Sequence, residues 1–243
     1  MGSRPSFHDH AVVIRTYDFG EADRVIVLLT KQHGIIRGVA KGVRRAKSRF
    51  GSRLQLFVNL SVQIYPGRGL ATITQADTID YFGAGIIDHY DRYTAACAVL
   101  ETAERLSLDD DPYLYEAVVA TLARIQRAAD PVLVLDAFVL QAMANAGWAP
   151  SLFDCAACSA PGPHHAFHPA VGGAACVHCR PPGAADVDPE TLHIMWLLAH
   201  GHAAQPTHSQ AAEVHQLTRA HLQWHLERKV TALSVMDQQI GCR

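Results

Sequence analysis

The chain has 243 residues, of which 49% are apolar and 18% charged, and its formal net charge is −2 at pH 7. This composition is typical of an ordinary soluble globular protein with a sizeable core, in one large domain or two to three small ones. We expect no secretion signal, because His8, Asp9 and His10 stand where its apolar core would be needed. We expect no membrane span, because the longest apolar stretch, residues 131–148, is interrupted by polar side chains. Six cysteines without a secretion signal fit a reducing cytoplasm, where thiols bind metal.

The charges are unevenly distributed along the chain. Residues 1–80 hold twelve Lys and Arg against six Asp and Glu, a balance of +6, whereas residues 81–243 hold nine against seventeen, a balance of −8. No acidic residue lies between Asp23 and Asp77, although ten cations do. A basic N-terminal module of this kind indicates a polyanionic partner.

The first third of the chain contains five short runs rich in Val, Ile and Thr, separated by glycine-containing turns. These predicted strands cover residues 11–14, 24–30, 35–40, 54–65 and 70–76. Five strands in under eighty residues favour a small closed barrel, because closure removes exposed strand edges. The OB-fold is the common five-stranded solution, and it binds nucleic acid on its strand 2–3 face and the adjoining loops.

A basic run follows the third predicted strand, with five cations between Ala40 and Phe50. It has neither a helical nor a strand period, so we expect a loop or a flexible extension. A solvated surface loop is the ordinary explanation of such a run, but the missing acids favour contact with a phosphate backbone. The cations predicted to contact DNA are Arg24, Arg37, Lys41, Arg44, Arg45, Lys47, Arg49 and Arg53.

Three aromatic residues near this run could stack on unpaired bases if they are exposed. We expect Phe57 and Tyr65 to lie in the barrel core instead. Phe50 stands among charges, so it is the predicted stacking residue. Glu21 and Asp23 are interpreted as parts of a turn-stabilising ion pair.

From about Asp88 the apolar period becomes helical. Aspartate followed by proline, the signature of a capped helix start, occurs at residues 111–112, 130–131 and 188–189. A last helix is expected to carry Val214, Leu217, His221 and Trp224 on one face. The helices before and after residue 150 are predicted to pack as one bundle, and His221 with His225 is interpreted as a packed or solvated pair.

Between these helices the chain carries two C-x2-C pairs separated by seventeen residues. This spacing is typical of a tetrahedral zinc site. The predicted ligands are Cys155, Cys158, Cys176 and Cys179, and one of them could be displaced by His164, His165, His168 or His178. With four protein ligands and no open position, the single zinc ion would be structural. Four unconnected thiols or a disulfide pair are the alternative.

No sequence signature of catalysis is present: there is no phosphate-binding loop, zinc-protease motif, nucleophile elbow, dinucleotide fingerprint or zinc-deaminase motif. The chain is therefore predicted to be a binding module and not an enzyme.

Several segments together resemble the RecO family of bacterial DNA repair proteins. They are residues 20–24, Thr30, Gly34, the basic run of residues 41–50, and residues 54–57. Further along the chain, residues 135–138, Gly147, Pro150 and the paired C-x2-C motifs continue the resemblance. It covers nearly the whole sequence.

The resemblance implies an N-terminal OB-fold, a helical domain and a zinc-binding segment. It also implies binding of single- and double-stranded DNA, annealing of complementary strands, and action with RecR to load the RecA recombinase onto strands coated by single-strand-binding protein. Contact with the acidic tail of that protein through the helical part is a further implication. A protein of this kind would be cytoplasmic and associated with the nucleoid.

The overall prediction is an α+β protein with an OB-fold barrel at residues 1–80 and helices at 81–150 and 187–243, interrupted by a zinc segment at 151–186. Its predicted function is that of a non-catalytic recombination mediator. A zinc-ribbon transcription regulator that reads duplex sequence is the alternative, and a zinc hydrolase acting on nucleic acid is a third hypothesis.

Overall fold

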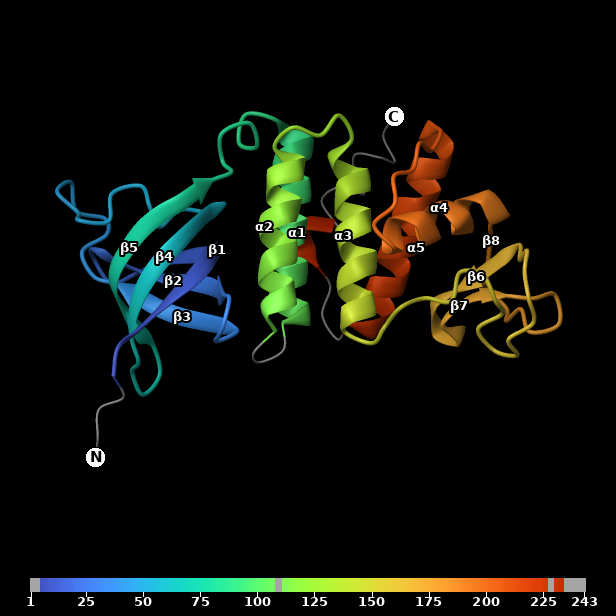
Figure 1. Ribbon diagram of the computed structural model, residues 1–243, viewed down its shortest axis with the longest axis horizontal. Helices are drawn as coiled ribbons and strands as arrows, with labels where there is room; N and C mark the ends of the chain where they lie inside the picture. Colours follow the sequence, from blue (N-terminus) through green and yellow to red (C-terminus); the bar gives the residue numbers. More distant parts are fainter. Residues whose placement is uncertain (1–4, 108–110, 227–229, 234–243) are drawn as a thin grey trace. The chain divides into compact units, whose positions relative to one another are not determined.

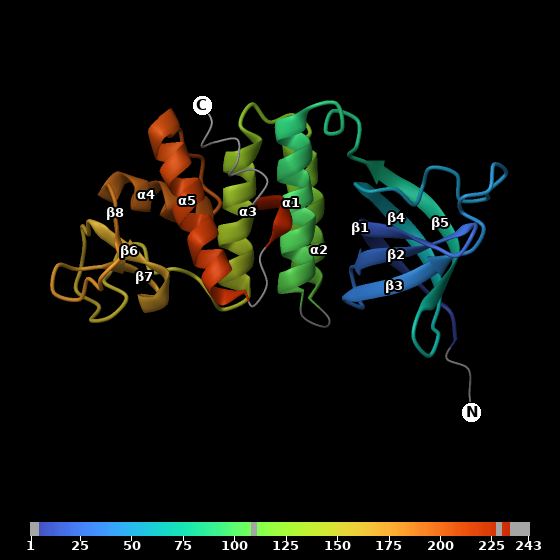
Figure 2. The ribbon, with the colours of Figure 1, turned by 180° about the vertical axis from the view of Figure 1, so that it is seen from behind.

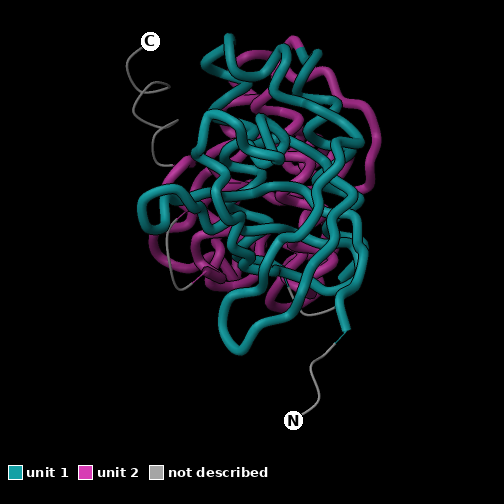
Figure 3. Tube along the Cα trace, turned by 90° about the vertical axis from the view of Figure 1, so that its left-hand side faces the viewer, with its two compact units in different colours: residues 1–128 teal, residues 129–243 magenta. Residues whose placement is uncertain are grey.

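The computed structural model describes residues 5–107, 111–226 and 230–233. The chain divides into two compact units, residues 1–128 and 129–243 (Figure 3). The elements of the first unit are β1 (Phe7–Phe19), β2 (Asp23–Thr30), β3 (Ile35–Ala40), β4 (Val58–Tyr65), β5 (Ala71–Tyr81), α1 (Tyr90–Leu106) and α2 (Pro112–Ile125). Those of the second are α3 (Pro131–Asn145), β6 (Ala166–His168), a 3-10 turn (Pro169–Val171), β7 (Gly173–Ala175), β8 (Ala185–Asp186), α4 (Pro189–Ala199) and α5 (His208–His225).

The five strands of the first unit form a closed barrel in the order β1-β2-β3-β5-β4 (Figure 1). The barrel is closed by a short parallel pairing, Gly38 with Ala71 and Val39 with Thr72. Strand β1 takes part in two antiparallel ladders: residues 7–12 pair with β4, and residues 11–19 pair with β2. This topology confirms the predicted five-stranded OB-like barrel.

Alternate residues along each strand point into the barrel and fill it. The buried cluster includes Ala11 and Val13 of β1, Ile26 and Leu28 of β2, and Ala40 at the end of β3. Gly38 belongs to the same inward row, and a Cβ there would lie 2.8 Å from the Ile73 side chain. Only glycine therefore allows β3 and β5 to approach this closely.

Strand β2 is buried on both of its faces, because residues 25–30 are all buried in succession. One face points into the barrel, and the other is covered by the helices of the same unit. Helix α2 packs against β1 and β2, and the Tyr115 hydroxyl donates a hydrogen bond to Asn59 of β4 at 2.9 Å. Helix α1 also packs on β1, and Phe57 and Tyr93 make an edge-to-face ring contact at 5.8 Å. Much of the outer face of strand 2, part of the surface predicted to bind nucleic acid, is therefore covered in this chain.

In the second unit, α3 packs against α4 and α5, which follow the cysteine segment (Figure 2). Three helices of the chain begin as the aspartate–proline pairs predict. The side chains of Asp111, Asp130 and Asp188 each accept a hydrogen bond from a backbone amide of the first turn. Helix α5 begins at Thr207 with a capping box.

Tyr65, which was predicted to lie in the barrel core, is 43% exposed, because at the end of β4 it points outward from the barrel wall. Of the four residues predicted on one face of the last helix, Val214, Leu217 and His221 are buried, whereas Trp224 near the end of α5 is 60% exposed.

None of the helices in the described part of the chain combines the length and the apolar composition needed to cross a bilayer. Helices α1 and α2 belong to the same compact unit as the barrel. The domain boundaries drawn from the sequence at residues 80, 150 and 186 remain a prediction.

Candidate nucleic-acid interface and metal centre

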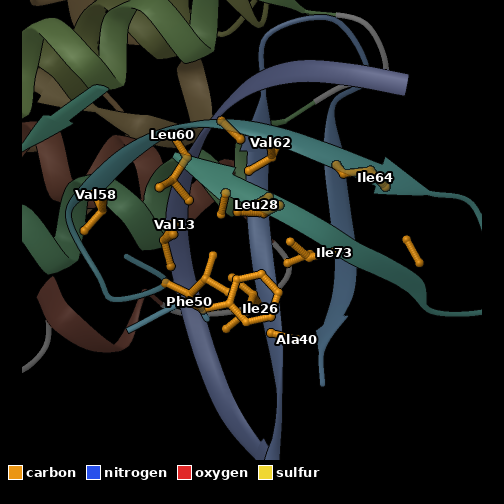
Figure 4. Packing of buried hydrophobic residues seen from close by; sticks show 14 residues of the cluster. Val13, Ile26, Leu28, Ala40, Phe50, Val58, Leu60, Val62, Ile64 and Ile73 are labelled. Carbon is orange, nitrogen blue, oxygen red and sulfur yellow. The ribbon is translucent and has the colours of Figure 1, made fainter. Parts of the chain in front are cut away.

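The basic run lies in the loop of residues 41–57, which connects β3 to β4 and has no regular secondary structure. Two apolar side chains of this loop, Phe50 and Leu54, are buried in the barrel core, at 1% and 2% exposure. Figure 4 shows the Phe50 ring beside Ile26 and Ala40. The loop is therefore anchored to the barrel and is not a flexible extension.

The prediction that Phe50 stacks on bases is wrong. Its ring has no accessible face for a base, because it fills the barrel core and leaves its charged neighbours at the surface. The guanidinium of Arg49 lies 4.9 Å from the ring centroid. Phe57 is buried as predicted, although its backbone takes a positive φ of 65° at the end of the loop.

The start of the loop is held against the β1–β2 hairpin. The backbone amide of Gly42 donates to the Asp23 carboxylate at 2.7 Å, and the amide of Arg44 donates to the Ala22 carbonyl at 3.0 Å. Asp23 thus stabilises the start of the loop by accepting this hydrogen bond, instead of forming the ion pair that was expected from the sequence. These two bonds bring the cations of the loop close to the hairpin at residues 18–24.

Two cations of the predicted set share one carboxylate at this hairpin. Arg24 donates from Nε to Asp18 at 2.8 Å, and Arg44 lies 3.4 Å from the second oxygen of the same side chain. The hydrogen bond from Arg24 lowers the pKa of Asp18, and the charge of Arg44 adds to this effect. At this one carboxylate, two positive charges therefore face one negative charge.

Five cations of the loop have no acidic partner among the residues that the structure describes. They are Lys41, Arg45, Lys47, Arg49 and Arg53, all of them exposed. Arg53 donates from its guanidinium to the Arg49 carbonyl at 3.0 Å, a bond within the loop that leaves its charge uncompensated. Uncompensated like charges on one ordered loop repel one another, and a polyanion would relieve that repulsion.

Arg37 lies apart from this group. It is on the outward side of β3, opposite Val27 of β2, and its guanidinium is 3.4 Å from Glu104 of α1. The same carboxylate binds Arg15 of β1 at 2.7 Å. The predicted DNA-contacting cations therefore divide into two sets. One is Arg37, which is tied to α1 through Glu104. The other, called the loop group below, consists of Arg24, Lys41, Arg44, Arg45, Lys47, Arg49 and Arg53.

Two aromatic residues that were not predicted from the sequence as part of the site are exposed beside the loop cations. Tyr17 and Phe19 lie at the end of β1 and are 45% and 48% exposed. They were missed because the first strand was predicted to end at Ile14, five residues before its observed end. The signal was present in the alternation of Arg15, Tyr17 and Phe19, which is typical of one strand face.

In the second unit the four cysteines of the C-x2-C pairs come together. The sulfur atoms of Cys155, Cys158, Cys176 and Cys179 all lie within 4.8 Å of one another. The sulfur atoms of Cys158 and Cys176 are 3.8 Å apart, close to the ~3.8 Å edge of a tetrahedron with metal–sulfur bonds of about 2.3 Å. The four thiols are thus placed to bind one metal ion. Among the described residues this group contains no histidine.

Backbone amides surround this cluster, and tight turns shape it. The Ser159 amide donates to the Cys155 carbonyl at 2.8 Å and the Arg180 amide to the Cys176 carbonyl at 2.9 Å, so each C-x2-C pair closes a turn. The Cys176 amide donates to the Cys155 sulfur at 3.4 Å. This bond, together with other amide donors, lowers the pKa of Cys155 to about 6.

The other thiols oppose one another's ionisation. Hydrogen bonding to the Cys158 sulfur, followed by that to Cys176, raises the pKa of Cys179 to about 12. Four thiolates this close repel strongly unless a cation lies between them. The donor set therefore fits a thiophilic dication such as zinc.

A small sheet in the order β7-β6-β8 supports the cluster. Its close approach to Ser151, in the segment between α3 and the first cysteine pair, depends on Gly173, where a Cβ would lie 2.2 Å from the Ser151 carbonyl oxygen. The φ of Gly173 is also positive, at 135°, so any other residue would be strained there. Arg180, just after the second pair, forms an ion pair with Asp186 of β8 at 2.7 Å.

Two protein-family models match the chain. The model described as recombination protein O N terminal matches residues 4–82, and the model described as recombination protein O C terminal matches residues 88–234. The N-terminal model matches the first part of the chain and the C-terminal model matches the part that follows it. Together the two matches cover nearly the whole sequence.

Proposed function

Because the chain belongs to the RecO family of DNA recombination and repair mediators, we propose that it binds single- and double-stranded DNA and anneals complementary strands without breaking bonds. One observation carries this proposal. An ordered loop, anchored in the barrel core by Phe50 and Leu54, presents Lys41, Arg45 and Lys47 without acidic partners in the described structure.

The proposed binding mode does not depend on the base sequence of the DNA. Lys and Arg side chains contact phosphates wherever the backbone passes, so affinity arises from released counterions and not from base contacts. Two strands held in this way keep their base edges free to pair. The proposed contacts are Arg24, Lys41, Arg44, Arg45, Lys47, Arg49 and Arg53; Arg37 is a secondary contact because Glu104 already engages it.

The anchoring of the loop supports this role energetically. A disordered basic tail must be ordered when it binds, which subtracts from the free energy of binding. Here the hydrogen bonds from Gly42 and Arg44 and the two buried side chains order the loop before DNA arrives. The exposed cations therefore lose only side-chain freedom on binding.

We also propose that the cysteine cluster holds one structural zinc ion with Cys155, Cys158, Cys176 and Cys179 as ligands. The ion would neutralise the mutual repulsion of the thiolates and fix the two turns of a segment with little core of its own. The backbone amides that donate to the Cys155 sulfur would hold this ligand in place.

The partners that fit this role are those implied by the family: RecR, single-strand-binding protein and the RecA recombinase. We propose that the chain works with RecR in the cytoplasm, at the nucleoid, to help RecA replace single-strand-binding protein. This arrangement needs a DNA-binding surface that tolerates any sequence, which the loop group supplies.

A strand-annealing assay tests the proposal. Complementary oligonucleotides, naked or coated by single-strand-binding protein, are mixed with the purified chain with and without RecR. Annealing faster than the protein-free rate on naked and coated strands is the expected result. Annealing at the protein-free rate would contradict the proposed role, and strong preference for one duplex sequence among unrelated competitors would favour a transcription regulator instead.

A further inference from the structure

The second half of β1 carries an exposed face with a regular pattern. Arg15, Tyr17 and Phe19 lie at alternate positions, so their side chains leave the strand on the same side. Thr16, between them, pairs with Ile26, which belongs to the barrel core. The side that bears the two aromatic rings is therefore the outside of the barrel. Both rings are about half exposed.

The register of the sheet shows what surrounds these rings. Tyr17 pairs with Val25, and Val25 pairs with Val39, so the outward row that contains Tyr17 continues with apolar residues across β2 and β3. On one side of this row lies the next outward row, with Arg15 and Arg37.

On the other side of the row, Phe19 pairs with Asp23, and Lys41 follows directly after the end of β3. In the row of Arg15 and Arg37, on the first side, both cations share Glu104, so two positive charges face one acid there. Lys41 has no acidic partner within the described residues. Tyr17 thus lies between the row of Arg15 and Arg37 and the row that holds Phe19 and Lys41.

We propose that Tyr17 and Phe19 form a stacking platform for the unpaired bases of single-stranded DNA. This inference rests on the proposed function, because it names the substrate that the barrel surface prefers. Flat aromatic rings bind the π-face of any base, and flanking cations bind the phosphates on either side. The combination fits a single strand and no particular sequence.

The spacing of the two rings favours a single strand over a duplex. Residues two apart on a strand are separated by about 6.8 Å, since the rise is about 3.4 Å per residue. Successive bases of a duplex strand are stacked at about 3.4 Å. Bases on the two rings would therefore belong to an extended strand whose own stacking is broken, and duplex bases are hidden from such rings.

This platform would serve annealing directly. A base stacked on a ring presents its pairing edge sideways, where a complementary strand can reach it. Phosphate contacts alone hold a strand without controlling the bases, so the rings add a preference for extended single strands over duplex product. Once the strands pair, the stacking contacts are lost and the duplex is held by its phosphates only.

The test compares Tyr17→Ala/Phe19→Ala with the wild-type chain on an oligo-dT strand and on a duplex of equal length. The expected result is a loss of single-strand affinity of about tenfold or more, with duplex affinity changed less than about twofold. Tyr113→Ala, an exposed tyrosine on α2, is the matched control and should change neither. Equal losses on both substrates, or no loss on either, would overturn the platform.

A second readout reports stacking itself. Phe19→Trp should retain single-strand affinity, and oligo-dT should quench its fluorescence beyond the change seen in the wild-type chain, whose three tryptophans lie outside the barrel. No added quenching at saturating oligo-dT would overturn the platform, even if an alanine variant failed to fold.

The two proposals fail in different ways. If Arg45→Glu/Lys47→Glu loses binding to both substrates while Tyr17→Ala/Phe19→Ala binds like wild type, the platform is wrong and the proposed function stands. If the charge-reversed variant also binds like wild type, the loop is not the DNA site.

Discussion

The carboxylate of Asp18 accepts a hydrogen bond from the Arg24 guanidinium at 2.8 Å, and its other oxygen lies 3.4 Å from Arg44. One acid at the barrel hairpin therefore engages two of the cations proposed to contact DNA. A phosphate arriving at this site competes with Asp18 for both guanidinium groups. Asp18 is thus expected to weaken DNA binding.

Replacing this acid should strengthen binding. Asp18→Asn removes one negative charge and frees two guanidiniums at an exposed site, where solvent keeps such ion pairs weak. We expect single-strand affinity to rise about fivefold at low salt, and the gain to shrink as salt screens the charges. Titration by fluorescence anisotropy at two salt concentrations measures this. Weaker binding of Asp18→Asn would show instead that Asp18 positions Arg24 and Arg44.

Sequence reasoning succeeded where a local pattern fixes the structure. The aspartate–proline pairs predict helix starts because capping depends on neighbouring residues, and β3 was predicted with its observed bounds, Ile35–Ala40. The cysteine cluster was predicted for the same reason, since two tight turns follow from the C-x2-C spacing. In each instance the few residues that make the pattern also make the contact.

Prediction from the sequence failed where the burial of a residue depends on distant parts of the chain. Phe50 stands among cations in the sequence, yet it fills the barrel core, because the loop passes over that core and only its apolar side chains turn inward. Tyr65 continues a buried strand but points outward. Strand β2 is buried on both faces, and the helix that packs on it, α2, begins more than eighty residues further along the chain.

The buried position of Phe50 leads to a stability prediction. Phe50→Ala leaves a cavity in the barrel and should lower the free energy of unfolding by about 3–5 kcal/mol, measured by urea denaturation. Phe50→Leu, which keeps most of the volume, should lose less. A stacking residue would behave in the opposite way: Phe50→Ala would keep its stability and lose single-strand affinity.

Removal of one cysteine should release the metal. Cys158→Ser lacks a thiolate ligand, so metal analysis of the purified variant should find little zinc, against one ion per wild-type chain. Thermal unfolding should shift downward as the binding free energy is lost. Cys97→Ser, a thiol of α1 outside the cluster, is the control and should keep its zinc. Wild-type protein purified without zinc but fully stable would refute the metal site.

The buried imidazole of His221 predicts a pH dependence of stability. Burial lowers its pKa to about 4 from an ordinary value of 6.5, while its Nε2 donates to the Trp148 carbonyl at 3.1 Å. The unfolded chain therefore takes up a proton as pH falls through 6.5, whereas the folded chain does so only near pH 4. Stability from this group is complete above pH 6.5 and is lost progressively down to pH 4, on the order of 3 kcal/mol in all.

His221→Gln keeps a donor for the Trp148 carbonyl but does not titrate. The difference in unfolding free energy between this variant and the wild type, followed from pH 7 to pH 4, isolates the histidine from other titrating groups. We expect the wild type to lose more stability than the variant over that range. Parallel curves for the two proteins would show that His221 binds its proton equally well in both states.

The salt dependence of single-strand binding tests the central claim most directly. For Arg45→Glu/Lys47→Glu, we expect affinity at least about tenfold lower than wild type and a slope of log affinity against log salt shallower by about 1.4, from two lost phosphate contacts. Arg124→Glu/Arg127→Glu, with the same change in net charge at the end of α2, should keep the wild-type slope. A wild-type slope in the loop variant, or equal losses in both variants, would contradict the claim that this anchored loop binds the DNA backbone.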